Sequence, residues 1–89
     1  MKSVESKDVG RRIGRVVDRF NLWRFDGLRA ELYQPKGTTG RYHVYVHFPD
    51  RDKVYAAHEW GILASYMLLE GLHVSDGPGG IDFLGMKVW

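Results

Sequence analysis

The sequence predicts an α+β domain with the element order α-β-β-β-α-β, in which an antiparallel sheet carries two helices packed on one face. Three observations predict this class: helical spacing of apolar residues in two segments, strict alternation in a third, and an Asp-Gly pair between alternating runs. The 89 residues suffice for a single domain spanning residues 1–89, of which we expect residues 1–6 to be flexible.

The first helix is predicted over residues 7–20. Its apolar residues form one stripe at helical spacing, namely Val9, Ile13, Val16, Val17 and Phe20. Basic residues run along another side at intervals of four, Lys7, Arg11, Arg15 and Arg19, with Arg12 beside them. Gly10 and Gly14 each cost a helix about 1 kcal/mol relative to alanine. Either this helix is weak, or another part of the chain approaches it closely at the glycines.

Two strands are predicted next, over residues 21–25 and 28–34, because Asp26-Gly27 between alternating runs is typical of a tight hairpin turn. On the second strand, Leu28, Ala30 and Leu32 share one face, while the polar face carries Arg29, Glu31 and Tyr33. Pairing across the two-residue turn adds Arg24 to that polar face.

The third strand, over residues 41–48, has the clearest alternation in the chain. Its apolar face consists of Tyr42, Val44, Val46 and Phe48, and its polar face of Arg41, His43, Tyr45 and His47. Pro49 ends this strand. We therefore expect one side of the sheet to pack against the helices and the other to face water.

The second helix is predicted over residues 53–70, from Lys53 to Glu70, with Asp50 or Asp52 as its N-cap and Gly71 in the left-handed position after its end. It is apolar on most sides and should be the central packing element. A mixed stripe containing Tyr55, Ile62, Tyr66 and Leu69 offers a homodimer or partner surface, unless the first helix or the last strand covers it. A last strand is predicted over residues 81–89, with its alternation interrupted by Gly85.

The composition narrows the functional classes. The absence of cysteine excludes disulfides and thiolate zinc sites, and no apolar stretch is long enough to span a bilayer. We expect a soluble, cytoplasmic protein that needs no cofactor and no membrane. Residues 1–53 carry twelve Lys and Arg against seven Asp and Glu, whereas residues 54–89 carry one against four. Such polarisation acts on partners rather than on the fold.

The polar sheet face is the candidate binding surface. It brings together Arg24, Arg29, Tyr33, Arg41, His43, Tyr45 and His47, and Arg11 and Arg15 of the first helix are expected beside it. Arginine binds phosphates through several donors, and tyrosine or histidine rings stack on exposed bases. We predict a small non-enzymatic module that binds nucleic acid. The alternatives are an ordinary solvated face, or a protein-binding inhibitor or adaptor, of the kind small phage or mobile-element genes encode, that docks the same surface on an acidic partner.

An enzymatic alternative uses the same face. In a metal-independent ribonuclease, His43 and His47 would act as base and acid and Arg41 would stabilise the phosphorane, although the sequence shows no orienting carboxylate. A metal site is disfavoured, because four residues along a strand span about 13 Å. Two ligands of one zinc ion each lie about 2.0–2.1 Å from the metal.

Overall fold

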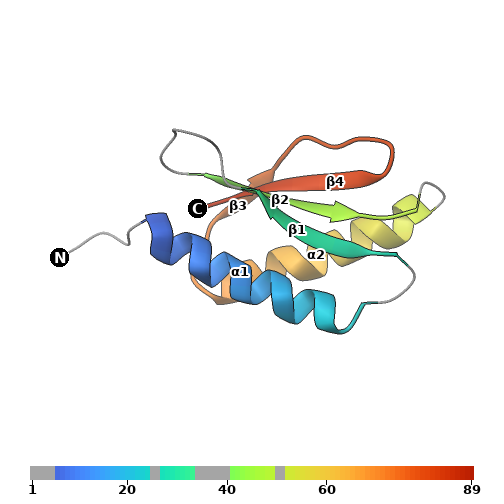
Figure 1. The fold of residues 1–89 in the computed structure, drawn as a ribbon. Coiled ribbons are helices and arrows are strands. Elements are labelled where there is room, and N and C mark those ends of the chain that lie inside the picture. Colours follow the sequence, from blue (N-terminus) through green and yellow to red (C-terminus); the bar gives the residue numbers. More distant parts are fainter. Residues whose placement is uncertain (1–5, 25–26, 34–40, 50–51) are drawn as a thin grey trace.

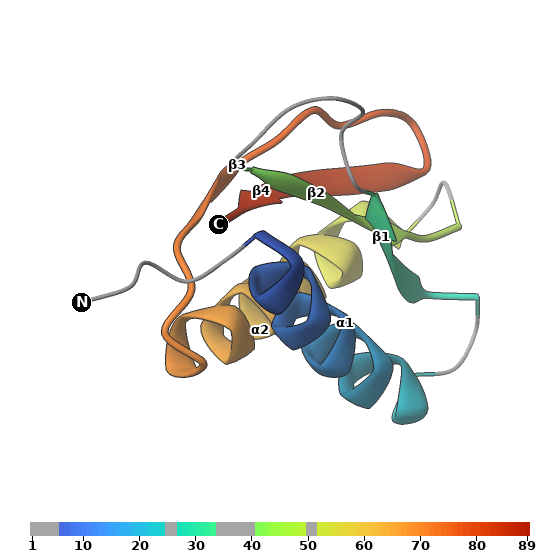
Figure 2. The same cartoon turned by 60° about the vertical axis from the view of Figure 1, so that its left-hand side comes forward.

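The computed structural model describes residues 6–24, 27–33, 41–49 and 52–89 (Figure 1). The element order is α-β-β-α-β-β: α1 Ser6–Leu22, β1 Arg29–Tyr33, β2 Tyr42–His47, α2 Lys53–Leu69, β3 Val74–Asp76 and β4 Phe83–Val88. The strands form one antiparallel sheet in the order β1-β2-β4-β3. Both helices lie on the same side of this sheet (Figure 2). The predicted fold class is confirmed, but the predicted order of strands is wrong.

The first error lies at the end of α1, where a strand was predicted over residues 21–25. Asn21 and Leu22 instead complete the helix. The Asn21 side chain donates a hydrogen bond to the carbonyl oxygen of Ala30 at 2.8 Å and accepts one from the Ala30 N–H at 2.7 Å. This side chain occupies the edge of β1 that a preceding strand would have paired with. Gly27 has a φ of 80°, so the glycine does mark a turn, but the turn follows a helix.

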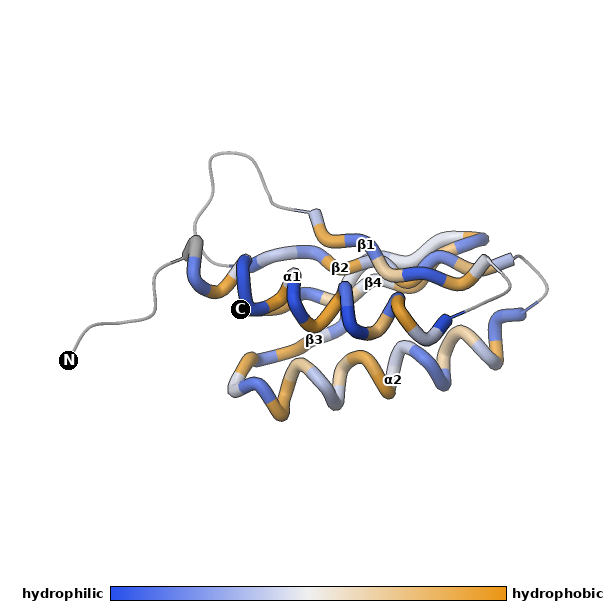
Figure 3. Tube along the Cα trace, turned by 60° about the horizontal axis from the view of Figure 1, so that its bottom comes forward, coloured by the Kyte–Doolittle hydropathy of each residue, from blue (hydrophilic) through white to orange (hydrophobic). Residues whose placement is uncertain are grey.

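The faces of β1 and β2 are as predicted. Ala30 pairs with Val46 and Leu32 with Val44 in the antiparallel register, and these side chains point toward the helices. The core that they join is built mainly from large, fully buried side chains: Ile13, Phe20, Val44, Val46, Leu63, Met67, Met86 and Val88. α1 packs mainly on β1, and α2 mainly on β4. In Figure 3, hydrophobic segments recur along α2, whereas α1 alternates between hydrophobic and strongly hydrophilic segments.

The end of α2 is also as predicted. Gly71 has a φ of 79°, its N–H bonds to the carbonyl of Leu68, and the N–H of Leu72 bonds to the carbonyl of Met67. This is the Schellman arrangement, and buried Leu72 supplies its hydrophobic contact. At the other end, Asp52 occupies the N-cap position without a side-chain capping bond. The alternative cap, Asp50, lies outside the described residues.

The chain after α2 forms two strands rather than the single predicted one. β3 was missed because it has only three residues and a turn-like composition; it pairs with β4 through Val74 and Val88. The interruption at Gly85 has a steric cause. A Cβ atom there would collide with the carbonyl oxygen of Pro78, because the loop between β3 and β4 passes over this point of the strand.

The two glycines of α1 have different explanations. A Cβ atom at Gly10 would lie 2.9 Å from the hydroxyl oxygen of Tyr42, whereas one at Gly14 would have no atom within 4 Å. The close approach of the Tyr42 side chain of β2 to the backbone of α1 therefore explains the glycine at position 10. No such contact explains Gly14, which only weakens the helix. Ser6 is the first residue of α1, and the other residues of the segment predicted to be flexible, 1–5, lie outside the described residues. No helix within the described ranges combines the length and apolar content needed to cross a bilayer.

Candidate functional site on the open sheet face

The sheet face opposite the helices carries a row of aromatic side chains. Tyr33 of β1, Tyr45 of β2 and Phe83 of β4 lie side by side, with ring centroids 4.7 Å apart in the first pair and 4.9 Å in the second. We call these three side chains the aromatic row. His43 and His47 flank Tyr45 edge-on at 6.2 and 6.3 Å. The contacts in the row are diagonal, because Tyr45 is in register with Glu31 and Gly85, two residues away from Tyr33 and Phe83 on the neighbouring strands. Diagonal neighbours across a sheet remain within reach of aromatic side chains.

The charges on this face are predominantly positive. Arg29 and Arg41 are exposed, and Lys87 lies on the same face of β4, in register with His43. Glu31 is the only acidic residue that the described strands place on this side of the sheet. Its carboxylate lies 3.7 Å from the guanidinium of Arg29 and 3.3 Å from Nε2 of His47. The single negative charge is thus offset locally, and the face keeps its cationic character.

A hydrogen bond within the site sets the protonation of two residues. The Tyr33 hydroxyl donates to Oε2 of Glu31 at 2.6 Å. This bond lowers the pKa of Glu31 below its ordinary value of 4.5, and Arg29 and His47 act in the same direction. The same bond raises the pKa of Tyr33 above 10.0. At neutral pH, Glu31 is therefore ionised, and Tyr33 is neutral with its hydroxyl directed at the carboxylate.

A second aromatic cluster lies at the other end of the sheet. The guanidinium of Arg41 lies 4.3 Å from the ring centroid of Trp89, and that ring stacks on His73 at 5.7 Å. Four members of the open face were not predicted from the sequence, namely His73, Phe83, Lys87 and Trp89. The apolar alternation of residues 84, 86 and 88 would have indicated three of them, since residues 83, 87 and 89 must then point the other way.

The placement of Arg24 on this face is wrong. Its Nε lies 3.0 Å from Oε1 of Glu59, and its guanidinium lies 4.0 Å from the ring centroid of Phe20. The side chains of Arg24 and Glu59 are only 12% and 8% exposed. Because residues 21–24 do not form a strand, Arg24 follows the end of α1 and turns toward α2. The pair is a buried structural contact, and Glu59 was not predicted as the partner of Arg24.

Arg11 and Arg15 also do not join the sheet residues. They belong to α1, which covers the opposite side of the sheet (Figure 2). Arg11 is exposed and lies 3.9 Å from Asp8, while Arg15 lines a groove between the two helices. The expectation that the first helix and the sheet form one binding surface is therefore wrong. The molecule has two separate cationic surfaces.

The two histidines of β2 have different surroundings on the open face. Nδ1 of His43 lies 3.5 Å from the Tyr45 hydroxyl, whereas His47 contacts Glu31 and its Nε2 atom is buried. The four residues that separate them on β2 correspond to about 13 Å, too far for both rings to act on one phosphate. A carboxylate does lie beside one of the histidines: Glu31 contacts His47. The sequence alone did not predict this contact. In the described part of the chain, no group of three or more His, Asp or Glu side chains is arranged to hold a metal ion.

We compared the chain with models of protein families, with curated proteins and with solved structures, and found no match. A function is therefore inferred from the aromatic row and the cations around it.

Proposed function

We propose that the open sheet face binds single-stranded nucleic acid and that the protein is a binding module rather than an enzyme. The observation that carries this proposal is the aromatic row, three rings in contact on the sheet face away from the helices, of which Tyr33 is exposed and Tyr45 and Phe83 are half-buried. Exposed Arg29 and Arg41 lie at opposite ends of the paired strands β1 and β2. Bases in a single strand are free to stack on such rings, whereas bases in a duplex are already stacked on each other.

The rings and the cations have separate tasks. Stacking contributes about 1–3 kcal/mol per base and tolerates any sequence. Arg29, Arg41 and Lys87 would neutralise phosphates and release their counterions. With these three contacts to a single strand, the slope of log K against log salt should be about −2. Stacking depends little on salt, so the two contributions can be measured apart.

The test is a titration of the full chain against a fluorescently labelled oligonucleotide of about 12 nucleotides, followed by anisotropy. The single strand and its matching duplex are compared at about 50 and 200 mM salt. We expect tighter binding of the single strand and the shallow salt slope given above. Labelled RNA should remain intact during prolonged incubation; cleavage that His47→Ala abolishes would contradict a binding-only role.

Two exposed aromatic residues provide a matched pair of variants. Tyr33→Ala removes one ring of the aromatic row and should weaken single-strand binding about 5- to 140-fold. Trp23→Ala removes a larger ring that is 68% exposed on the helical side and should leave binding unchanged. Equal effects of the two variants, or no binding at low salt, would overturn the proposal. A stoichiometric protein recovered after nuclease treatment would then favour the inhibitor or adaptor alternative.

A further inference from the structure

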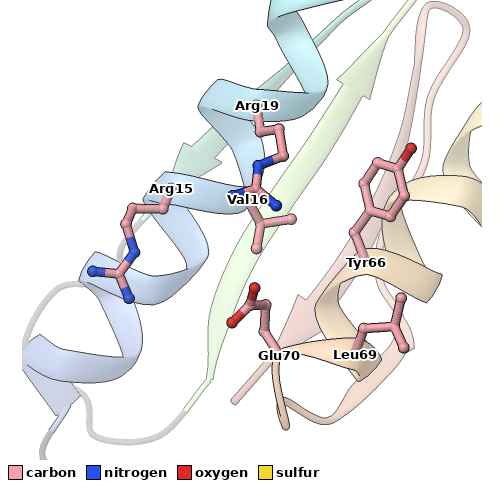
Figure 4. A pocket seen from close by; sticks show the side chains of 6 residues that line it. All are labelled: Arg15, Val16, Arg19, Tyr66, Leu69 and Glu70. Atoms are coloured by element: carbon pink, nitrogen blue, oxygen red, sulfur yellow. The ribbon is translucent and has the colours of Figure 1, made fainter.

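The helical side of the molecule contains a groove that the proposed function does not use. It lies between α1 and α2, has a volume of about 290 Å³, and is lined by Arg15, Val16, Arg19, Tyr66, Leu69 and Glu70. Val16 is only 6% exposed and forms an apolar floor, while Leu69 is 83% exposed at the rim. Figure 4 shows Arg19 and Glu70 extending into the space between the helices, with Tyr66 and Leu69 on the α2 side.

The charges along the groove are distributed unevenly. Arg15 and Arg19 line the α1 side at four-residue spacing, which corresponds to about 6 Å along the helix axis. Among the described residues, no carboxylate lies at ion-pair distance from Arg15 or Arg19. Across the groove, the carboxylate of Glu70 is the only acidic group in the lining. The groove therefore combines an apolar floor with a regularly spaced cationic wall.

We propose that this groove binds an amphipathic helix of a partner protein. Apolar residues at i, i+3 or i+4, and i+7 of that helix would enter the recess above Val16. Acidic residues four positions apart would follow the same 6 Å spacing, about one helical turn, beside Arg15 and Arg19. This surface lies on the other side of the molecule from the aromatic row, so the proposal does not depend on nucleic-acid binding.

A partly apolar groove could also bind a second copy of this chain or a membrane surface, but charge and shape favour the acidic helix. A second copy docking through α2 would offer only Glu70, because Glu59, the other acid of that helix, is buried against Arg24. An anionic membrane would satisfy the arginines, but a flat lipid surface would leave the recess above Val16 unfilled. A helix supplies both the spaced acids and the protruding apolar side chains.

The test uses a displayed library of amphipathic helical peptides. The apolar positions are fixed as leucine in the i, i+3, i+7 pattern, and the flanking positions are randomised among glutamate, glutamine and lysine. The full chain is the bait, and the bound peptides are sequenced. We expect glutamate to be enriched on one flank at four-residue spacing. Equal recovery of the three residue types, or recovery of no peptide, would overturn the proposal.

A charge swap locates the binding site. With the double variant Arg15→Glu and Arg19→Glu as bait, the selection should reverse and favour lysine, and a glutamate-rich peptide should lose at least about tenfold in affinity. The matched control is Arg29→Glu and Arg41→Glu, which changes the net charge equally on the sheet face. It should weaken nucleic-acid binding and leave peptide affinity within about twofold. Equal loss of peptide affinity in both double variants would show an effect of net charge and would refute the groove.

Two further measurements can contradict the choice of occupant. Light scattering of the unmodified chain should give a monomer; a dimer that Leu69→Asp dissociates would assign the groove to a second copy. Vesicles containing anionic phospholipid should not sediment the protein. Sedimentation that Leu69→Asp abolishes, without peptide binding, would assign the groove to a membrane surface.

Discussion

The buried ion pair between Arg24 and Glu59 allows the energetics of the fold to be tested directly. Replacing Glu59 by glutamine removes the carboxylate and leaves the guanidinium of Arg24 in a site where it is 12% exposed. Breaking a buried pair in this way costs about 3–5 kcal/mol. Arg24 keeps its contact with the ring of Phe20, so we expect the lower end, about 3 kcal/mol. For a domain of this length, whose stability is about 4–13 kcal/mol, this is a severe loss.

The assay is urea denaturation followed by tryptophan fluorescence and circular dichroism. Glu59→Gln should lower the midpoint without changing the m-value, because the surface exposed on unfolding is the same. Thermal unfolding should shift downward by about 12–24 °C. Glu31→Gln is the matched control: it neutralises a carboxylate that also contacts an arginine, but on the open sheet face. It should change stability by less than about 1 kcal/mol.

A double variant separates the cost of an unpaired charge from the value of the pair. Arg24→Met with Glu59→Leu replaces both charges by apolar side chains of similar size and should recover most of the stability lost in Glu59→Gln. The reasoning is refuted if Glu59→Gln costs less than about 1 kcal/mol. It is also refuted if the double variant is no more stable than the single one.

Three further outcomes are expected. Gly14→Ala should stabilise the protein by about 1 kcal/mol in urea denaturation, whereas Gly10→Ala should not, because its added methyl group meets a tyrosine of β2; equal gains would contradict the contrast. Asn21→Ala should destabilise the protein by about 1–3 kcal/mol and promote self-association by opening the edge of β1, measured by denaturation and sedimentation; unchanged stability would show that the side chain does not protect this edge. In a spectrophotometric pH titration, Glu31→Gln should lower the pKa of Tyr33 toward 10.0. The raised pKa stabilises the native protein below pH 10, and this contribution is lost as the pH rises through the folded-state pKa; an unchanged titration would refute the hydrogen bond.

Where apolar and polar residues alternate strictly along a segment, the sequence alone predicted which side chains are buried. Residues 41–48 have apolar side chains at every second position, and the structure buries those positions and leaves His43 and Tyr45 on the other face. The end of α2 was equally clear, since Gly71 has the conformation that the local pattern requires. In these cases, the information lies within a few consecutive residues, because one side of the element contacts the core and the other contacts solvent.

The tertiary structure alone decided which elements meet. Local pattern could not show that Asn21 occupies the edge of β1, that Arg24 turns inward to Glu59, or that Arg15 lies on the far side of the sheet from Arg41. It also missed β3, whose three residues become a strand only by pairing with β4. Hydrophobic periodicity records which side of an element is buried. The choice of neighbour depends on contacts between residues far apart in the chain, and no local pattern encodes them.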